Sequence, residues 1–483
     1  LLAVFVLGGW GVGRLMPTRL AGAVAAVTLT WNAYVAERLA IGHWGFLLGL
    51  AALPWAVGAG TAVRRGEPGA VPRLCLVLAL TGLAGSTALV MVTLLVVVLL
   101  VGTGWRDRMR PLGWSLLTAS GAAAPWLVPA LRQAGSLPTD PEGVTAFAAR
   151  ADTPLGLLPS LLTTGGIWNP AVWPAERGST VVAVVTLLLV MTAVAAGAGP
   201  WRRTGGATAT AVLAAGALGL VLAAAGAVPG LRDLLRSVVV HVPGGGLLRD
   251  GQKFAALAVL PLACCAGLAA QRARAHVTNG AWLLLVVPVA VLPSLAWGVH
   301  GRLDPATYPG SWRALRAEVE RATDATPGAV AVFPFTYYRR YAWNHDHVVL
   351  DPLPRLLDAD VVENDDLPLA DRVVRGEDPR AARIRRALDD GADLAAALAA
   401  EDVRWVVEQR DQPDRTGQLA RLSALPIVWS AGDLTLRRVP GPPVPPPDRQ
   451  APVGVVLGAV TLLAALGVVL LPRRWRRWYA RAR

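Results

Sequence analysis

The sequence predicts a polytopic α-helical membrane protein, with about eleven helices and a small α/β domain outside the membrane. Of its 483 residues, 54% are hydrophobic and only 16% are charged, whereas a soluble domain carries about 25% charged residues. Many of its apolar runs approach the ~20 residues that cross a ~30 Å hydrocarbon core. Short arginine-rich turns separate these runs, and one long stretch of alternating strand and helix patterns interrupts them.

The apolar runs set the expected helices. The segment 72–103 is too long for one span, and small residues at 82–86 permit a tight turn that divides it. The runs at 1–13, 20–31 and 72–84 are shorter than a full span, so the helix count is approximate. In order, the runs are 1–13, 20–31, 43–63, 72–84, 86–103, 111–133, 180–198, 206–228, 253–270, 281–299 and 454–471.

The turns between the runs predict the topology. Basic turns face the cytoplasm in membrane proteins, and here they alternate with loops that are less basic. The intervening loops then face outward. Because the arginines behind the net charge of +13 cluster in these short turns, we interpret them as setting the topology and not as a nucleic-acid-binding surface. The basic segments are 14–19, 64–73, 105–110, 201–206, 271–276 and the tail 473–483.

We therefore divide the chain into a transmembrane helical domain at 1–299, an extracytoplasmic α/β domain at 300–440, a proline-rich linker at 441–453, a final helix at 454–471 and a basic cytoplasmic tail at 472–483. In the α/β domain, strand patterns occur at 329–335, 347–351, 403–409 and 426–439, and helix patterns at 311–323 and 379–401, the second broken at Gly391.

The chain begins inside an apolar run, without an initiator Met or a basic leader region. The alternation of loops puts residue 1 at the outer face, so we expect at least one further helix and one outer loop upstream of it. Three cysteines without paired spacing support neither a disulfide framework nor a zinc site.

The segment "HVPGGGLLRDGQKF", residues 241–254, holds the only lysine of the chain. Three glycines precede Arg249, Asp250 and Lys253, and the lysine stands at the start of an apolar run. Cations at a helix N-terminus favour phosphate, so this segment is a candidate site for a lipid-linked phosphate. The alternative is a solvated loop whose lysine extends to the membrane surface.

Two further loops offer candidates. "WNAYVAERLAIGHW", residues 31–44, carries Glu37, Arg38 and His43 in an expected outer loop. Its alternative is an ordinary surface ion pair that orients two helix ends, worth about 0–1 kcal/mol. Asp140 and Glu142, in the large loop that follows the run at 111–133, could bind an acceptor or a metal.

These residues carry a family resemblance. "NAYVAERLAIGHWGFLLGLAALPW" resembles the N-P-[FY]-V-x-E-R-L-x-x-G-[QH]-W motif of polytopic GT-C-type glycosyltransferases, although Ala33 replaces the usual proline. "LLRDGQKFAALAVLPLA" is similar to the L-L-R-[DN]-x-x-K-F segment of the same group, which includes the arabinofuranosyltransferases of mycobacterial cell walls.

The resemblance implies a polyprenyl-phosphate-linked sugar as donor, a glycan or glycolipid acceptor, a site facing outward from the cytoplasmic membrane, and a divalent cation such as Mg or Mn; no redox cofactor is expected. It also implies a catalytic carboxylate on the first outer loop, which we expect upstream of residue 1. Arg249 and Lys253 suit the departing phosphate. Asp250 is a poor base, because an adjacent arginine lowers the pKa of its carboxyl.

The expected function is therefore a membrane glycosyltransferase of cell-envelope assembly. The alternatives are a non-catalytic accessory or scaffold of lipid-linked glycan assembly and, less favoured, a transporter of lipid or glycan. Transporters place ionisable residues within their spans, and six of the runs from 86–103 onward hold none except Lys253 at an edge.

Overall fold

The computed structural model describes residues 1–101, 105–132, 139–242, 244–369, 371–442, 444 and 453–470. The predicted tail at 472–483 lies outside the described residues, as does most of the proline-rich linker at 441–453. The chain divides into two compact units. The first comprises Leu1–Arg132, Gly143–Leu303 and Pro452–Arg483, and the second comprises Gln133–Glu142 and Asp304–Ala451.

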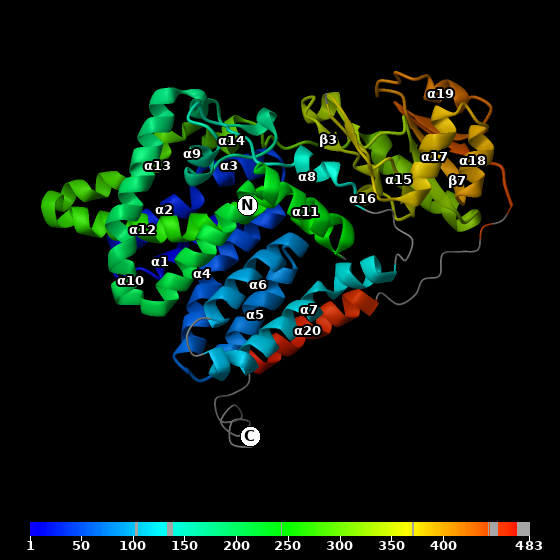
Figure 1. The fold of residues 1–483 in the computed structure, drawn as a ribbon. Coiled ribbons are helices and arrows are strands. Elements are labelled where there is room, and N and C mark those ends of the chain that lie inside the picture. Colours follow the sequence, from blue (N-terminus) through cyan, green and yellow to red (C-terminus); the bar gives the residue numbers. More distant parts are fainter. Residues whose placement is uncertain are drawn as a thin grey trace, which may run out of the picture. The chain divides into compact units, whose positions relative to one another are not determined.

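The first unit is helical (Figure 1). Four of its helices pass the length and apolarity expected of a membrane span, or five if a bent pair counts as one. In Figure 1 the C-terminal helix α20, drawn in red, lies along α7. The helices are α1 (Leu2–Gly13), α2 (Arg19–Thr30), α3 (Ala33–Ala40), α4 (Trp44–Arg64), α5 (Ala70–Gly82), α6 (Ser86–Val101), α7 (Met109–Arg132), α8 (Glu142–Ala146, which begins in the second unit), α9 (Leu157–Leu162), α10 (Thr180–Ala225), α11 (Pro229–His241), α12 (Ala256–Val277), α13 (Val287–Val291), α14 (Ala296–His300) and α20 (Val453–Leu470).

Helix α10 consists of two helical segments joined at a break. The backbone at Gly206 is not helical, with φ 53° and ψ −134°. Gly197 and Gly216, on either side of the break, both pack on α12: a Cβ would lie 2.5 Å from the Cα of Cys265 in the first case and 2.7 Å from the Cγ of Pro261 in the second. In a straight helix these glycines would lie ~28 Å apart, but four residues of α12 span only ~6 Å. The two halves therefore fold back on each other, which confirms separate runs at 180–198 and 206–228.

The predicted span at 281–299 is wrong as a single helix. This region is a 3₁₀ segment followed by α13 and α14. Its two halves, Gly280–Val291 and Pro293–His300, meet at an angle of 75°. Pro293 follows the break, and proline disfavours helical backbone in the residue before it. That residue, Leu292, uses its carbonyl instead to accept a hydrogen bond from the indole of Trp31, at 2.9 Å.

The basic turns gather at one end of the first unit. Helix α2 runs antiparallel to α12, so the turn at 14–19 meets the segment 271–276, where Thr18 donates a hydrogen bond to Gln271. On the other side of that segment, Arg272 donates to the carbonyl of Ala196, next to the turn at 201–206. The other ends of the same helices carry α3 and the start of α12. The predicted alternation of turns is thus present in the helical unit, and its orientation in the membrane stays a prediction.

The second unit is a five-stranded mixed sheet covered by helices on both faces. Its strand order is β4-β1-β7-β9-β8, with β1 parallel to β4 and β7. One face packs on α17 and α18 and the other on α15. The predicted strands and helices of this region are confirmed, including the break at Gly391, which has φ +67°. The strands are β1 (Ala329–Phe333), β2 (Tyr338–Arg339), β3 (Val349–Leu350), β4 (Val361–Val362), β5 (Leu367–Pro368), β6 (Val373–Val374), β7 (Val403–Gln409), β8 (Ile427–Ala431) and β9 (Leu434–Arg438), and the helices are α15 (Gly310–Ala325), α16 (Leu353–Leu356), α17 (Pro379–Asp389), α18 (Leu394–Ala400) and α19 (Gln418–Arg421).

Candidate functional site

Helix α3 builds one wall of a polar cluster in the first unit. The region 32–43 was expected to be a loop, but Asn32 caps a helix there by accepting a hydrogen bond from the amide of Val35, at 3.1 Å. Asparagine at this position satisfies an amide that would otherwise lack a partner. Residues Ala33 to Leu39 are all buried. The sequence therefore carries Tyr34, Glu37 and Arg38 into the interior.

Arg38 is the centre of the cluster. Its side chain is fully buried and binds both carboxylate oxygens of Asp250, at 3.1 and 3.4 Å. The guanidinium also donates to Gln252 and, at 3.1 Å, to Nδ1 of His43. A guanidinium can only donate, so this nitrogen of His43 accepts. The alternative of a surface Arg38–Glu37 pair is wrong, because both side chains are 0% exposed and each binds other residues.

Lys253 is the accessible cation of this cluster. Its ammonium lies 3.6 Å from the Oδ2 atom of Asp250, and its side chain keeps 23% of its surface exposed, against 7% for the carboxylate and none for Arg38. The Tyr34 hydroxyl donates to the carbonyl of Lys253 at 2.6 Å and so fixes the backbone there. Arg249 stacks on Phe147, 5.3 Å from the ring centre. Four sequence-predicted residues, Arg38, His43, Asp250 and Lys253, are thus brought together.

The glycines before Arg249 have structural roles. Gly244 adopts a left-handed backbone conformation with φ +79°. A Cβ on Gly245 would lie 2.3 Å from the carbonyl oxygen of Val238 in α11, so only glycine fits this contact. The segment then continues as two 3₁₀ turns that lead into α12.

A second buried pair lies beside Glu37. Arg177 binds both carboxylate oxygens of Asp152, one of them at 3.0 Å, and also donates to Thr163. A Cβ on Gly165 would collide with both partners of this pair. The carbonyl of Gly165 accepts from Gln252 at 3.1 Å, which joins the second pair to the Arg38 cluster.

Burial and neighbouring charge set the protonation of these groups. Burial, followed by the charge of Asp152, raises the pKa of Glu37 well above its usual value, which favours the protonated carboxyl. Burial alone would raise the pKa of both Asp152 and Asp250. Arg177 instead holds the pKa of Asp152 below its usual value. Arg38 and Lys253 do the same for Asp250. The pKa of Asp250 was predicted to be low because of an adjacent arginine; the direction is right, and the cations responsible are Arg38 and Lys253.

His43 is neutral at pH 7. Burial, with the charges of Arg38 and Lys253, lowers its pKa to about 4. The cluster therefore holds the cations of Arg38 and Lys253 against the single carboxylate of Asp250. An excess positive charge remains at the exposed edge formed by Lys253, which suits an anion such as a phosphate.

The other predicted residues lie in the second unit. Asp140 accepts from the amides of Glu142 and Arg375, at 2.9 and 2.8 Å. Glu142 forms a half-exposed ion pair with Arg372, at 2.9 Å. Both carboxylates hold the segment around 372–375 of the same unit, whereas Asp250 and Glu37 belong to the first unit.

The expected divalent cation does not fit the described residues. Among them, no three His, Cys, Asp or Glu side chains gather closely enough to hold a metal ion. The Asp250 carboxylate already binds two cations, and Glu37 is fully buried with a raised pKa. The metal requirement stays a prediction, and we derive no chemical step from it.

Sequence reasoning missed Tyr34, Asp152, Arg177 and Gln252. A signal existed for two of them, because Tyr34 and Gln252 lie inside the two motifs quoted from the sequence. No local signal marks Asp152 and Arg177, which lie 25 residues apart, the first in irregular backbone and the second in a short 3₁₀ helix.

Comparison with known proteins gives a likeness of fold. No family model matches the chain, and no curated protein matches it in sequence. Two cryo-EM structures of the arabinofuranosyltransferase AftD from Mycobacteria, the second of them a mutant, are similar over 90% and 92% of this chain, each with a TM-score of 0.56 and 18% identity. The chain spans only about a third of their length, 33% and 35%. The resemblance predicted from the sequence is confirmed as a shared membrane-embedded fold.

Proposed function

We propose, starting from a fold shared with a membrane arabinofuranosyltransferase, that this chain belongs to a membrane glycosyltransferase of the GT-C type. Its donor is a polyprenyl-phosphate-linked sugar, its acceptor a glycan or glycolipid of the cell envelope, and it acts at the outer face of the cytoplasmic membrane. The observation that carries the proposal is the excess positive charge at Lys253, at the end of the helical unit opposite to the basic turns.

The chemistry that the cluster supports is phosphate binding and release. Lys253 contacts the phosphate of the donor, and its ammonium stabilises the charge that develops on this phosphate when the sugar leaves. Asp250 and Arg38 are positioning residues, because they hold the ammonium from the buried side. Arg249 adds a second cation to the same segment.

A non-catalytic accessory of lipid-linked glycan assembly is the second candidate. It is favoured by the environment of the carboxyl groups, since Asp250 and Asp152 are bound by arginine, and Glu37 is buried with a raised pKa. None of these three suits a general base for an acceptor hydroxyl. Such a protein would bind the lipid phosphate at Lys253 without transferring sugar.

The test measures phosphate binding by the full chain in lipid nanodiscs, with farnesyl phosphate as probe and farnesol as its uncharged counterpart. Loss of one charge-assisted bond of about 1.5–3 kcal/mol weakens binding by about ten- to a hundredfold. We expect this for Lys253→Ala with farnesyl phosphate and no change with farnesol. Lys253→Arg restores much of the binding.

Arg203→Gln is the matched control, because it removes one exposed cation from the basic turn at 201–206. Equal farnesyl phosphate binding by Lys253→Ala and the unaltered protein would contradict the proposal and leave Lys253 as a residue that extends to the membrane surface. Binding without sugar transfer, measured on whole-cell lipid-linked glycans, would favour the accessory role.

A further inference from the structure

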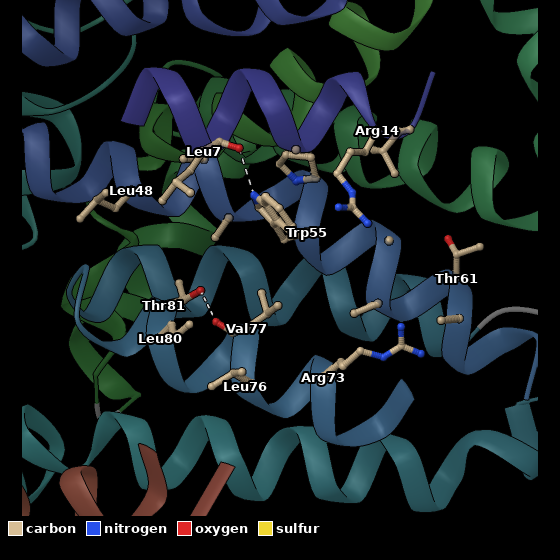
Figure 2. A pocket seen from close by; sticks show the side chains of 18 of the residues that line it. Leu7, Arg14, Leu48, Trp55, Thr61, Arg73, Leu76, Val77, Leu80 and Thr81 are labelled. Atoms are coloured by element: carbon tan, nitrogen blue, oxygen red, sulfur yellow. Dashed lines mark hydrogen bonds between the residues drawn. The ribbon is translucent and has the colours of Figure 1, made fainter. Parts of the chain in front are cut away.

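An apolar groove lies between α1, α4 and α5, away from the polar cluster (Figure 2). Its volume is about 710 Å³, within the range of about 300–1,000 Å³ that is usual for ligand sites. Leu7, Leu48, Ala52, Leu76 and Leu80 line its walls. A groove of this size with aliphatic walls suits the acyl chain of a lipid, because burial of each CH₂ group is favourable.

Cations gather at one end of the groove. Arg14, Arg65 and Arg73 line it where α1 and α4 end and α5 begins, together with the single carboxylate of Glu67. Glu67 lies 3.5 Å from Arg73 and 3.9 Å from Arg65. Three arginines against one carboxylate leave an excess of two positive charges at this rim.

Arg14 is held in place without a counter-charge. Its guanidinium lies 5.6 Å from the ring centres of both Trp10 and Trp55. Figure 2 shows it beside Trp55, whose indole donates to the carbonyl of Leu7 at 3.0 Å. No carboxylate forms an ion pair with Arg14 in the part of the chain that the structure describes. The cation is therefore preorganised and available to a ligand.

We propose that this groove binds an anionic phospholipid, with an acyl chain along α1, α4 and α5 and the phosphate between Arg14 and Arg73. Basic pockets between membrane helices bind acidic headgroups, and anionic lipids concentrate in the cytoplasmic leaflet that basic turns face. The rim belongs to the turns at 14–19 and 64–73, at the end opposite to Lys253. The lipid site is thus independent of the proposed sugar transfer.

The first experiment compares phosphatidylglycerol with phosphatidylcholine of identical acyl chains, titrated into the detergent-solubilised full chain and followed by native mass spectrometry. One arginine near a lipid headgroup contributes about fivefold in affinity. We expect phosphatidylglycerol to bind at least about tenfold tighter, because the rim has two excess charges. Arg14→Gln and Arg73→Gln should each weaken phosphatidylglycerol about fivefold and phosphatidylcholine by less, because the choline cation offsets the charge of its phosphate.

Arg19→Gln is the matched control for charge, because this exposed arginine of the same basic turn lies outside the groove. Equal binding of the two lipids overturns the proposal, and so does an equal loss with Arg19→Gln. The absence of any bound lipid overturns it as well, and a further protein segment then becomes the occupant to consider.

A second variant tests the groove itself without changing charge. Gly58 lines the groove, and the nearest atom to a Cβ placed there is 3.9 Å away, on Leu15, so a larger side chain enters the groove without a backbone clash. Gly58→Leu should weaken both lipids by tenfold or more, because its side chain takes the space of the acyl chain. Gly113→Leu, at an exposed glycine of α7 with nothing within 4 Å, is the control. Unchanged lipid binding by Gly58→Leu contradicts the proposed acyl path.

Discussion

The buried pair Arg38–Asp250 of the first unit and the buried pair Arg339–Asp351 of the second unit differ in the charge around them. In the second unit Arg339 binds Asp351 at 2.8 Å, with both side chains 0% exposed. Gln409 and the amide of Leu353 also donate to this carboxylate, at 2.9 Å each. The charges balance one to one, and the pair ties β2 to the turn that begins α16 and to the end of β7.

In the first unit Arg38 binds Asp250 with similar geometry, but Lys253 lies on the same carboxylate and remains partly exposed. The buried pair is therefore left with an additional cation at its edge. A balanced pair can only hold backbone segments together, whereas an unbalanced one also offers charge to a ligand. The partly exposed Lys253 therefore distinguishes the Arg38–Asp250 pair, as part of a binding site, from the similarly buried Arg339–Asp351 pair.

The largest expected effect comes from removing the arginine of either pair. Arg38→Leu and Arg339→Leu each leave a buried carboxylate without its main partner, which lowers the free energy of unfolding by about 3–5 kcal/mol. Chemical unfolding of the detergent-solubilised protein measures this loss. Only Arg38→Leu should also weaken farnesyl phosphate binding, because Asp250 then neutralises Lys253.

Arg38→Lys separates charge from geometry. It keeps the positive charge but not the two-pronged contact with Asp250, so it should restore part of the phosphate binding and little of the stability. A loss of phosphate binding in Arg339→Leu as large as that in Arg38→Leu would remove the distinction between the two pairs.

A carboxyl group with a raised pKa lies near each pair, Glu37 in the first unit and Glu363 in the second. The pKa of Glu37 is raised by burial and by Asp152, so the folded state retains a proton that the unfolded state releases above about pH 4.3. The stability contributed by this protonated carboxyl is complete at low pH and is lost as the pH rises. Glu37→Gln should therefore be as stable as the unaltered protein near pH 4 and increasingly more stable above it, measured by chemical unfolding at several pH values.

Glu363 in the second unit supplies the matched variant. Burial, followed by the charge of Asp351, raises its pKa to about 7. The advantage of Glu363→Gln should therefore grow only up to about pH 7, whereas that of Glu37→Gln continues beyond it if its pKa is higher. A pH-independent difference between Glu37→Gln and the unaltered protein would show that Glu37 is ionised in the fold.

Local sequence patterns predicted most of the fold. The strand patterns at 329–335 and 403–409 predicted the two central strands, both of which are fully buried, and Gly391 ended a helix as expected because it adopts a left-handed conformation. Local reasoning failed where partners are distant or where competing signals overlap. The run 281–299 is apolar enough for a span, but Pro293 bends it. The polar residues in 32–43 predicted a loop, although most of this segment forms the buried helix α3.

The site was predicted only in part for the same reason. Lys253 stood out because it is the only lysine, and Asp250 lies three residues before it. The contact between Arg38 and Asp250, however, joins residues 212 positions apart. No periodicity or spacing encodes that pairing, since it arises from the packing of α3 against the start of α12. The burial of Arg38, which converts a surface pair into the centre of a site, could be seen only in three dimensions.

The smallest expected effect comes from Glu142, a predicted site residue that belongs to the second unit. Its ion pair with Arg372 is about 40% exposed on both sides, and exposed pairs contribute about 0–1 kcal/mol. Glu142→Gln should therefore change the free energy of unfolding by less than about 1 kcal/mol and leave farnesyl phosphate binding unchanged. Arg372→Gln, which removes the other partner, should behave alike, because neither partner of an exposed pair is left buried without a counter-charge. A severalfold loss of phosphate binding in Glu142→Gln alone would mean that this carboxylate contacts the ligand directly, and that buried charge is not what distinguishes the site.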